Sequence, residues 1–148
     1  MKRVFLLGFF WILGSSGSTS AQTPSDQSDI AQITATLMDY IEGTANGDRA
    51  RLRRAFHPDF KLYTVTEQDS LRIRSGEAYI MGFKEGVKVN RIGRIIALDY
   101  EKDAAMAKVE VVVPNWRIFI DYLLLMKYEG RWKIVQKSYT WRPIPKSE

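Results

Sequence analysis

The sequence predicts an α+β fold, in which helices come first and a sheet follows within one domain. Three observations predict it. Apolar residues recur at helical spacing early in the chain, the spacing changes to alternation after Arg91, and the turns between the later segments are short enough for hairpins. A run of helices followed by a run of strands is typical of this fold class.

The N-terminus has the order of a secretory signal peptide. Lys2 and Arg3 precede an apolar stretch at 4–13, and small residues follow. This stretch is about half of the ~20 residues that a membrane-spanning helix needs, so we expect cleavage after Ala21. The expected organisation is a signal peptide at 1–21, a short leader at 22–28 and one domain at 29–148. The mature protein is therefore expected in the periplasm or outside the cell, with no membrane contact.

Composition argues against several kinds of site. Of the 148 residues, 45% are hydrophobic and 26% are charged, as expected for a globular domain with a core. The sequence has no cysteine and a single histidine, His57, so thiolate chemistry and a metal site are not predicted, and neither is a cofactor. The formal charge of +5 falls once the signal peptide is removed. We interpret the arginines at 49–54 as a solvated helix face and predict no nucleic-acid partner.

Two helices are predicted at the start of the domain. The apolar side of the first is formed by Ile30, Ile33, Leu37, Tyr40 and Ile41. Asp26, Ser28 or Asp29 is its candidate N-cap, and Asn46-Gly47 ends it. Asp48 is placed to cap a second, short helix that runs to Phe56. A turn is predicted at 57–59, because the proline there restricts the residue before it.

Strands dominate the rest of the chain. Two short strands are expected at 60–66 and 71–75, and a brief helix follows from Ser75 to about Phe83. Four further strands are predicted at about 92–100, 105–113, 118–128 and 132–141, joined by short turns.

One carboxylate, Asp121, interrupts the strand IFIDYLLLMKY. If Glu129-Gly130 is a two-residue turn, alternation places Asp121 on one face with Gln136 and Ser138. The opposite face then carries Ile118, Ile120, Tyr122 and Tyr139, among others. Both faces are largely apolar, which predicts that both are covered, the second by loops or another subunit. A bulge would shift this register by one residue.

Asp121 therefore lies among apolar neighbours, where an unpaired carboxylate is costly. It must be paired, hydrogen-bonded or protonated. One interpretation is a purely structural hydrogen bond to a nearby donor. The other is a polar group inside a ligand pocket.

Several segments resemble the nuclear transport factor 2-like superfamily, and within it the lumazine-binding branch, which is related to SnoaL-like and ketosteroid-isomerase-like domains. They are DYIEGTANGDRARLRRAFHPD, RIGRII, AAMAKVEV and FIDYLLLMKYEGRWKIVQKSY. The resemblance covers about 29–141. It implies a cone in which a curved antiparallel sheet wraps around the N-terminal helices, with a pocket inside and frequent dimerisation through the sheet.

The ketosteroid isomerase relatives add expectations about residues. Tyr40 and Asp121 match that family's two hydrogen-bond donors to a substrate oxyanion. The position of its general base falls near Thr64 and Val65, and neither side chain accepts a proton at neutral pH. His57 is the remaining candidate base, and it can serve only if its ring points into the cone.

We therefore predict an exported domain that binds a small planar or apolar molecule, and binding is favoured over catalysis. The predicted ligand-binding residues are Tyr40, Asp121, Gln136, Ser138 and Trp116. One alternative is an isomerase, dehydratase or cyclase-like enzyme in which Tyr40 and Asp121 donate to an oxyanion, with His57 as base. Another is a homodimeric assembly or protein-interaction module built on the second apolar face.

Overall fold

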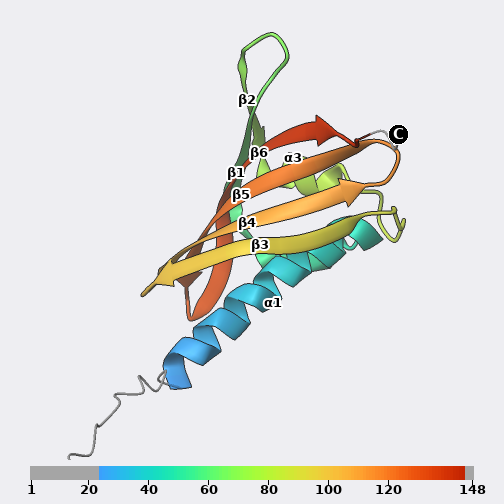
Figure 1. The fold of residues 1–148 in the computed structure, drawn as a ribbon. Coiled ribbons are helices and arrows are strands. Elements are labelled where there is room, and N and C mark those ends of the chain that lie inside the picture. Colours follow the sequence, from blue (N-terminus) through green and yellow to red (C-terminus); the bar gives the residue numbers. More distant parts are fainter. Residues whose placement is uncertain (1–23, 146–148) are drawn as a thin grey trace, which may run out of the picture.

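The structure is a computed structural model that describes residues 24–145, so the predicted signal peptide at 1–21 lies outside the described residues. Figure 1 shows the elements in order. They are α1 (Pro24–Asn46), α2 (Arg49–Ala55), β1 (Phe56–Val65), β2 (Leu71–Ser75), α3 (Gly76–Met81), β3 (Ile92–Glu101), β4 (Ala104–Val113), β5 (Arg117–Tyr128) and β6 (Arg131–Pro143). The α+β prediction is confirmed. No helix in the described part of the chain is long and apolar enough to span a membrane.

The strands form one curved, unclosed sheet in the order β2-β1-β6-β5-β4-β3. Neighbours are antiparallel except for β1 and β6, which are parallel. The sheet is therefore mixed, whereas an antiparallel one was expected. Hairpin turns fix only the directions of strands that follow each other in sequence, and β1 and β6 do not. Helix α1 packs against β3 and β6 on the inner side of the curve.

Helix starts agree with the sequence except at α1. Asp48 caps α2, since its carboxylate accepts a hydrogen bond from the backbone N–H of Arg51 at 2.8 Å. Helix α1 begins at Pro24, so the predicted caps at 26–29 lie within it. The Asp29 carboxylate instead accepts hydrogen bonds from Lys127 and Trp132, which lower its pKa. This side chain ties the start of α1 to the β5–β6 hairpin.

The turn predicted at 57–59 is wrong, because β1 already begins at Phe56. Phe56 pairs with Ile134, and regular pairing with β6 resumes only at Lys61. Pro58 lies in this interrupted stretch, where its missing N–H breaks no ladder hydrogen bond. The proline therefore marks an irregularity within a strand.

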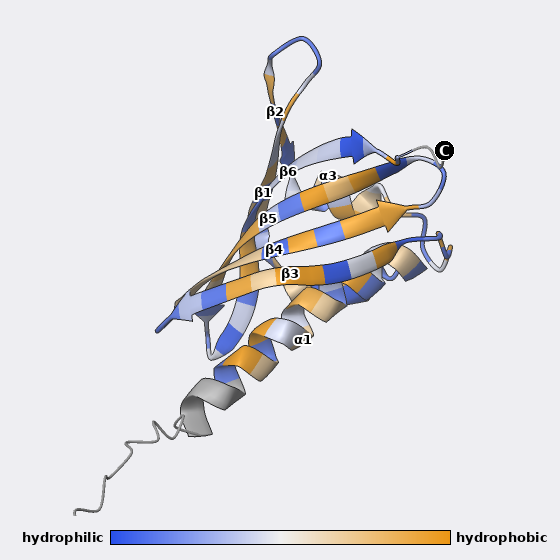
Figure 2. Ribbon diagram, in the orientation of Figure 1, coloured by the Kyte–Doolittle hydropathy of each residue, from blue (hydrophilic) through white to orange (hydrophobic). Residues whose placement is uncertain are grey.

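The core lies between the inner face of the sheet and the helices. Leu37 of α1, Leu52 of α2 and Leu123 and Leu125 of β5 are almost fully buried. Phe56 and Phe60 stack with ring centroids 3.9 Å apart, and the edge of Tyr40 meets Phe56 at 5.5 Å. This aromatic cluster holds Tyr40 against the sheet. Figure 2 shows apolar and polar residues alternating along the strands, as a sheet with distinct faces requires.

A β-bulge in β6 changes which side chains share a face. Leu125 lies opposite Ile134, but Leu124 lies opposite Gln136, so Val135 is the extra residue. Beyond the bulge, Asp121 lies opposite Tyr139 and Leu123 opposite Lys137. The predicted face of Gln136 and Ser138 is therefore wrong, because they lie on the outer side of the sheet. Lys137 and Tyr139 take their places on the inner side.

Candidate functional site

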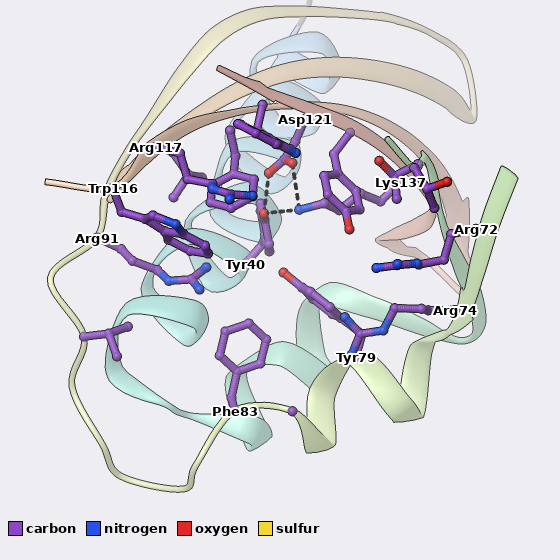
Figure 3. A pocket seen from close by; sticks show the side chains of 18 of the residues that line it. Tyr40, Arg72, Arg74, Tyr79, Phe83, Arg91, Trp116, Arg117, Asp121 and Lys137 are labelled. Carbon is purple, nitrogen blue, oxygen red and sulfur yellow. Dashed lines mark hydrogen bonds and ion pairs between the residues drawn. The ribbon is translucent and has the colours of Figure 1, made fainter. Parts of the chain in front are cut away.

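Three polar side chains meet on the inner side of the sheet. Tyr40 donates its hydroxyl proton to Oδ2 of Asp121, and Nζ of Lys137 donates to the Tyr40 hydroxyl oxygen at 2.5 Å. Lys137 Nζ also lies 2.8 Å from Oδ1 of Asp121 in an ion pair, without hydrogen-bond alignment. The dashed lines in Figure 3 mark these contacts. We call these three residues the polar triad.

The triad is joined from elements far apart in the sequence. Tyr40 lies on the buried side of α1, Asp121 in the middle of β5 and Lys137 just past the bulge of β6. Asp121 and Tyr40 are 0% and 1% exposed, and Lys137 is 5% exposed. Burial of two opposite charges is tolerated here because each faces the other.

Burial and charge set the proton occupancy of the triad. Desolvation lowers the pKa of Lys137, but the Asp121 carboxylate and the phenol of Tyr79 outweigh it, so the pKa is raised from its ordinary value of 10.5. Desolvation, followed by the Asp121 charge, raises the pKa of Tyr40 well above 10.0. The lysine is therefore an ammonium and the tyrosine a neutral phenol at neutral pH.

Tyrosine rings surround the ammonium of Lys137. Its Nζ lies 4.7 Å from the ring centroid of Tyr40, 5.3 Å from that of Tyr139 and 5.4 Å from that of Tyr79. Ring faces attract a cation, and more strongly where water is excluded. These three rings therefore stabilise the positive charge of Lys137.

A cavity of about 770 Å³ opens beside the triad. Its aromatic lining is Tyr40, Tyr79, Phe83, Trp116, Phe119, Tyr139 and Trp141. Its basic lining is Arg72, Arg74, Lys84, Arg91, Arg117 and Lys137, and its acidic lining is Glu67 and Asp121. Figure 3 shows the triad between Arg91 and Arg117 on one side and Arg72 and Arg74 on the other. The volume is within the range of small-molecule sites, roughly 300–1,000 Å³.

The structure separates the predicted site residues into two groups. Tyr40, Asp121 and Trp116 line the cavity. Gln136 and Ser138 do not, because the bulge turns them outward. His57 also lies elsewhere, with its Nδ1 accepting from the backbone N–H of Asp59 and its ring against Tyr128 at 5.3 Å. The ring of His57 therefore does not point into the cone, as it would have to do if His57 were the base.

Lys137 and the arginines were missed at the sequence level. Lys137 is flanked by the two polar residues that were chosen, so the correct strand was identified in the wrong register. Asp121, predicted as a hydrogen-bond donor, is an acceptor for Tyr40 and an ion partner for Lys137. Within residues 24–145, no group of three or more histidine, aspartate or glutamate side chains is placed to hold a metal ion.

Comparisons with known proteins agree with this architecture. The sequence model of the family described as "Putative lumazine-binding" matches residues 28–140. A relative named aldolase FrzH, from Cladobotryum sp, is 26% identical over 118 residues, which span 76% of this chain and 90% of that protein.

Solved structures show the same fold. An NTF-2 like protein of unknown function from Silicibacter pomeroyi DSS-3 is 28% identical, with a TM-score of 0.70 over 79% of this chain and 98% of its own. An NTF2-like protein of unknown function from Shewanella baltica OS155 is 23% identical, with a TM-score of 0.71 over 84% of this chain and 100% of its own. Because the family match spans most of the sequence and the cone is shared, this chain belongs to the "Putative lumazine-binding" family of the nuclear transport factor 2-like superfamily.

Proposed function

We propose that the cavity binds a small planar organic molecule, and that the polar triad fixes one of its polar atoms. The observation that carries the proposal is a cavity of about 770 Å³ with aromatic walls and a buried ammonium at its back. Apolar walls with a few convergent polar groups are typical of ligand sites.

The triad favours a hydrogen-bond acceptor on the ligand. Lys137 has three N–H protons and directs two towards Tyr40 and Asp121. Tyr40 donates its own proton to Asp121. The ammonium of Lys137 and the hydroxyl of Tyr79 that points towards it in Figure 3 are together suited to a carbonyl oxygen. Lumazine, a planar heterocycle with carbonyl oxygens, is a suitable first probe.

Ligand binding is tested by titrating the protein with lumazine, riboflavin and progesterone while following tryptophan fluorescence and the melting temperature. We expect at least one planar compound to bind and to raise the melting temperature. Trp116→Ala, at the 53% exposed Trp116 of the cavity, should weaken it by about tenfold or more. Tyr128→Ala, at a similarly exposed ring outside the cavity, is the matched control. No response to any compound at about 1 mM, the weak limit of small-ligand affinity, contradicts the proposal.

A second candidate is an enzyme that acts on a carbonyl compound. Two observations favour it, namely the buried Lys137–Tyr40 pair and the likeness to a protein named as an aldolase. The ammonium of Lys137 would polarise a carbonyl oxygen and stabilise an enolate, while hydroxide from solvent in the cavity removes the α-proton, because His57 lies outside the cavity. If this is correct, cyclohexanone in deuterium oxide exchanges its α-hydrogens faster with the wild-type protein than with Lys137→Met, as followed by NMR. Equal exchange with both proteins and with buffer removes this candidate.

We also propose export and cleavage after Ala21. The order of charged, apolar and small residues at 1–21 supports this. Mass spectrometry of a periplasmic extract should find Gln22 at the N-terminus of the mature protein. A chain that retains Met1 and stays with the cytosol contradicts it.

We propose further that the outer face of the sheet forms a homodimer. On β4 and β5 it exposes Met106, Tyr122, Leu124 and Met126, each between 39% and 48% exposed. Exposed apolar patches of this kind mark association surfaces. Leu124→Lys should shift a dimer to a monomer in light scattering, whereas Ile30→Lys on α1 should not. A wild-type monomer at high concentration contradicts the dimer.

A further inference from the structure

Four arginines at the mouth of the cavity have no carboxylate partner within residues 24–145. They are Arg72, Arg74, Arg91 and Arg117. Every other arginine in that part of the chain pairs with an aspartate or glutamate, except Arg131 at the tip of the β5–β6 hairpin. The unpaired guanidinium groups are therefore concentrated around one cavity.

Aromatic rings, rather than carboxylates, support three of these guanidinium groups, and Arg74 lies over Tyr79 at 5.8 Å. The Arg117 guanidinium carbon lies 3.7 Å from the ring centroid of Trp141 and 4.3 Å from that of Trp116. Arg91 lies over Phe83 at 5.3 Å. A guanidinium that stacks on a ring keeps its N–H groups free at its edge, where they match the two oxygens of a carboxylate or phosphate.

The described cavity lining holds six basic residues and two acidic ones. Its acids are Glu67, which is exposed, and Asp121, which is already paired with Lys137. A low-dielectric recess with excess positive charge concentrates anions. We therefore expect the ligand itself to carry the negative charge that balances these arginines.

The arginines form two clusters on opposite sides of the cavity. Figure 3 shows Arg91 and Arg117 flanking Trp116 on one side, and Arg72 and Arg74 on the other. Arg91 and Arg117 are both half-buried and stacked on rings. In the second cluster Arg72 is exposed, and Arg74, although half-buried over Tyr79, already donates a hydrogen bond to the carbonyl oxygen of Ala78 at 3.1 Å. The first cluster is the better-ordered anion site, because less side-chain freedom is lost when it binds.

We propose that the ligand of this cavity is a planar aromatic anion, whose carboxylate or phosphate group is held by Arg91 and Arg117 and whose ring packs against Trp116. This inference rests on the proposed binding function and adds the charge of the ligand to it. Aromatic carboxylates and aromatic phosphate esters share this chemistry, and the probes below distinguish them.

The test compares three compounds that share one ring system: 2-naphthoate, 2-naphthyl phosphate and 2-naphthamide. Isothermal titration calorimetry at low salt should give 2-naphthoate or 2-naphthyl phosphate an affinity about 10 to 100-fold above that of the neutral amide. The anion that binds more tightly shows whether the site prefers a carboxylate or a phosphate group. Arg91→Gln with Arg117→Gln should abolish this preference, so that the anions bind the variant no more tightly than the amide does. Arg131→Gln, which removes an unpaired arginine far from the cavity, should keep it.

Salt provides a second measurement that needs no variant. Affinity for the anions should fall as sodium chloride is raised, while affinity for 2-naphthamide stays level. Thermal unfolding of each variant shows whether it is folded, since Arg117 also packs on Trp141.

Each alternative result has a distinct meaning. Equal affinity for the anions and the amide, with no salt effect, overturns the anion inference but leaves the binding function standing. Loss of preference only in Arg72→Gln with Arg74→Gln overturns the assignment to the first cluster. No binding of any of the three compounds overturns the inference, and the titrations with lumazine, riboflavin and progesterone then decide separately whether the binding function stands.

Discussion

Replacing Lys137 by methionine is expected to lower the free energy of unfolding by about 3–5 kcal/mol. The substitution leaves the Asp121 carboxylate fully buried without its cation, and only the hydroxyl of Tyr40 still bonds to it. Urea denaturation at neutral pH measures the loss. Lys108→Met is the control, because Lys108 lies on the outer side of the sheet, away from the triad, with its Nζ 5.7 Å from the ring centroid of Tyr122.

A second variant tests whether the lost charge pair is the cause. Asp121→Asn together with Lys137→Met removes both charges and keeps an acceptor for Tyr40. We expect the double variant to be more stable than Lys137→Met alone. If Lys137→Met costs less than about 1 kcal/mol, Asp121 finds another partner and the triad is not a stabilising unit.

Stability should also decline in alkali because of the triad. The folded-state pKa of Lys137 is raised from 10.5 and that of Tyr40 from 10.0, so both groups hold their protons more tightly in the folded chain. Their contribution is fully present below these ordinary values and is lost as pH rises through the folded-state values. Denaturation series from neutral pH to about pH 11 should show this loss. If the stability of Lys137→Met falls as steeply with rising pH as that of the wild type, groups outside the triad cause the decline.

Gly47→Ala is expected to cost about 2 kcal/mol or more. Gly47 has φ of 62°, a left-handed conformation, and an added Cβ would lie 2.3 Å from the backbone oxygen of Lys84. The loop that follows α3 is anchored here, because the N–H of Gly86 donates to the Gly47 carbonyl oxygen at 3.1 Å. Since Lys84 lines the cavity, the substitution should weaken ligand binding as well.

Comparison with Gly86→Ala separates the backbone strain of a positive φ from the steric clash of the added Cβ. Gly86 also has a positive φ, 69°, but no atom lies within 4 Å of the position that an added Cβ would take. The substitution should therefore cost only the left-handed strain, roughly 1 kcal/mol. Thermal and urea unfolding of both variants give the comparison. Equal losses show that the loop moves aside at Gly47 without penalty.

Local patterns predicted most of the fold. Periodicity located the helices and the four long strands, and Asp48 caps α2 as predicted because capping depends only on residues nearby in sequence. The errors came from interactions between distant segments. The turn predicted at His57 lies within β1, and the direction of β1 is set by pairing with β6, which no short-range pattern encodes.

The candidate site was only partly predictable for the same reason. Resemblance had identified Tyr40 and Asp121 as a pair, and the two side chains are hydrogen-bonded in the structure. Lys137 could not be chosen without the bulge at Val135, since one extra residue exchanges the two faces of a strand. The mouth arginines come from β2, the loop after α3 and the start of β5, and only the folded chain brings them to one opening.

The span of the triad also determines when the cavity can first exist. Tyr40 and Lys137 are 97 positions apart, and β6 is the last strand within residues 24–145. During synthesis the first helix emerges long before the lysine that completes the back wall. A ribosome-bound or prematurely terminated product that lacks β6 therefore has neither the ammonium nor the parallel partner of β1, and ligand capture cannot begin before β6 has been made and has paired.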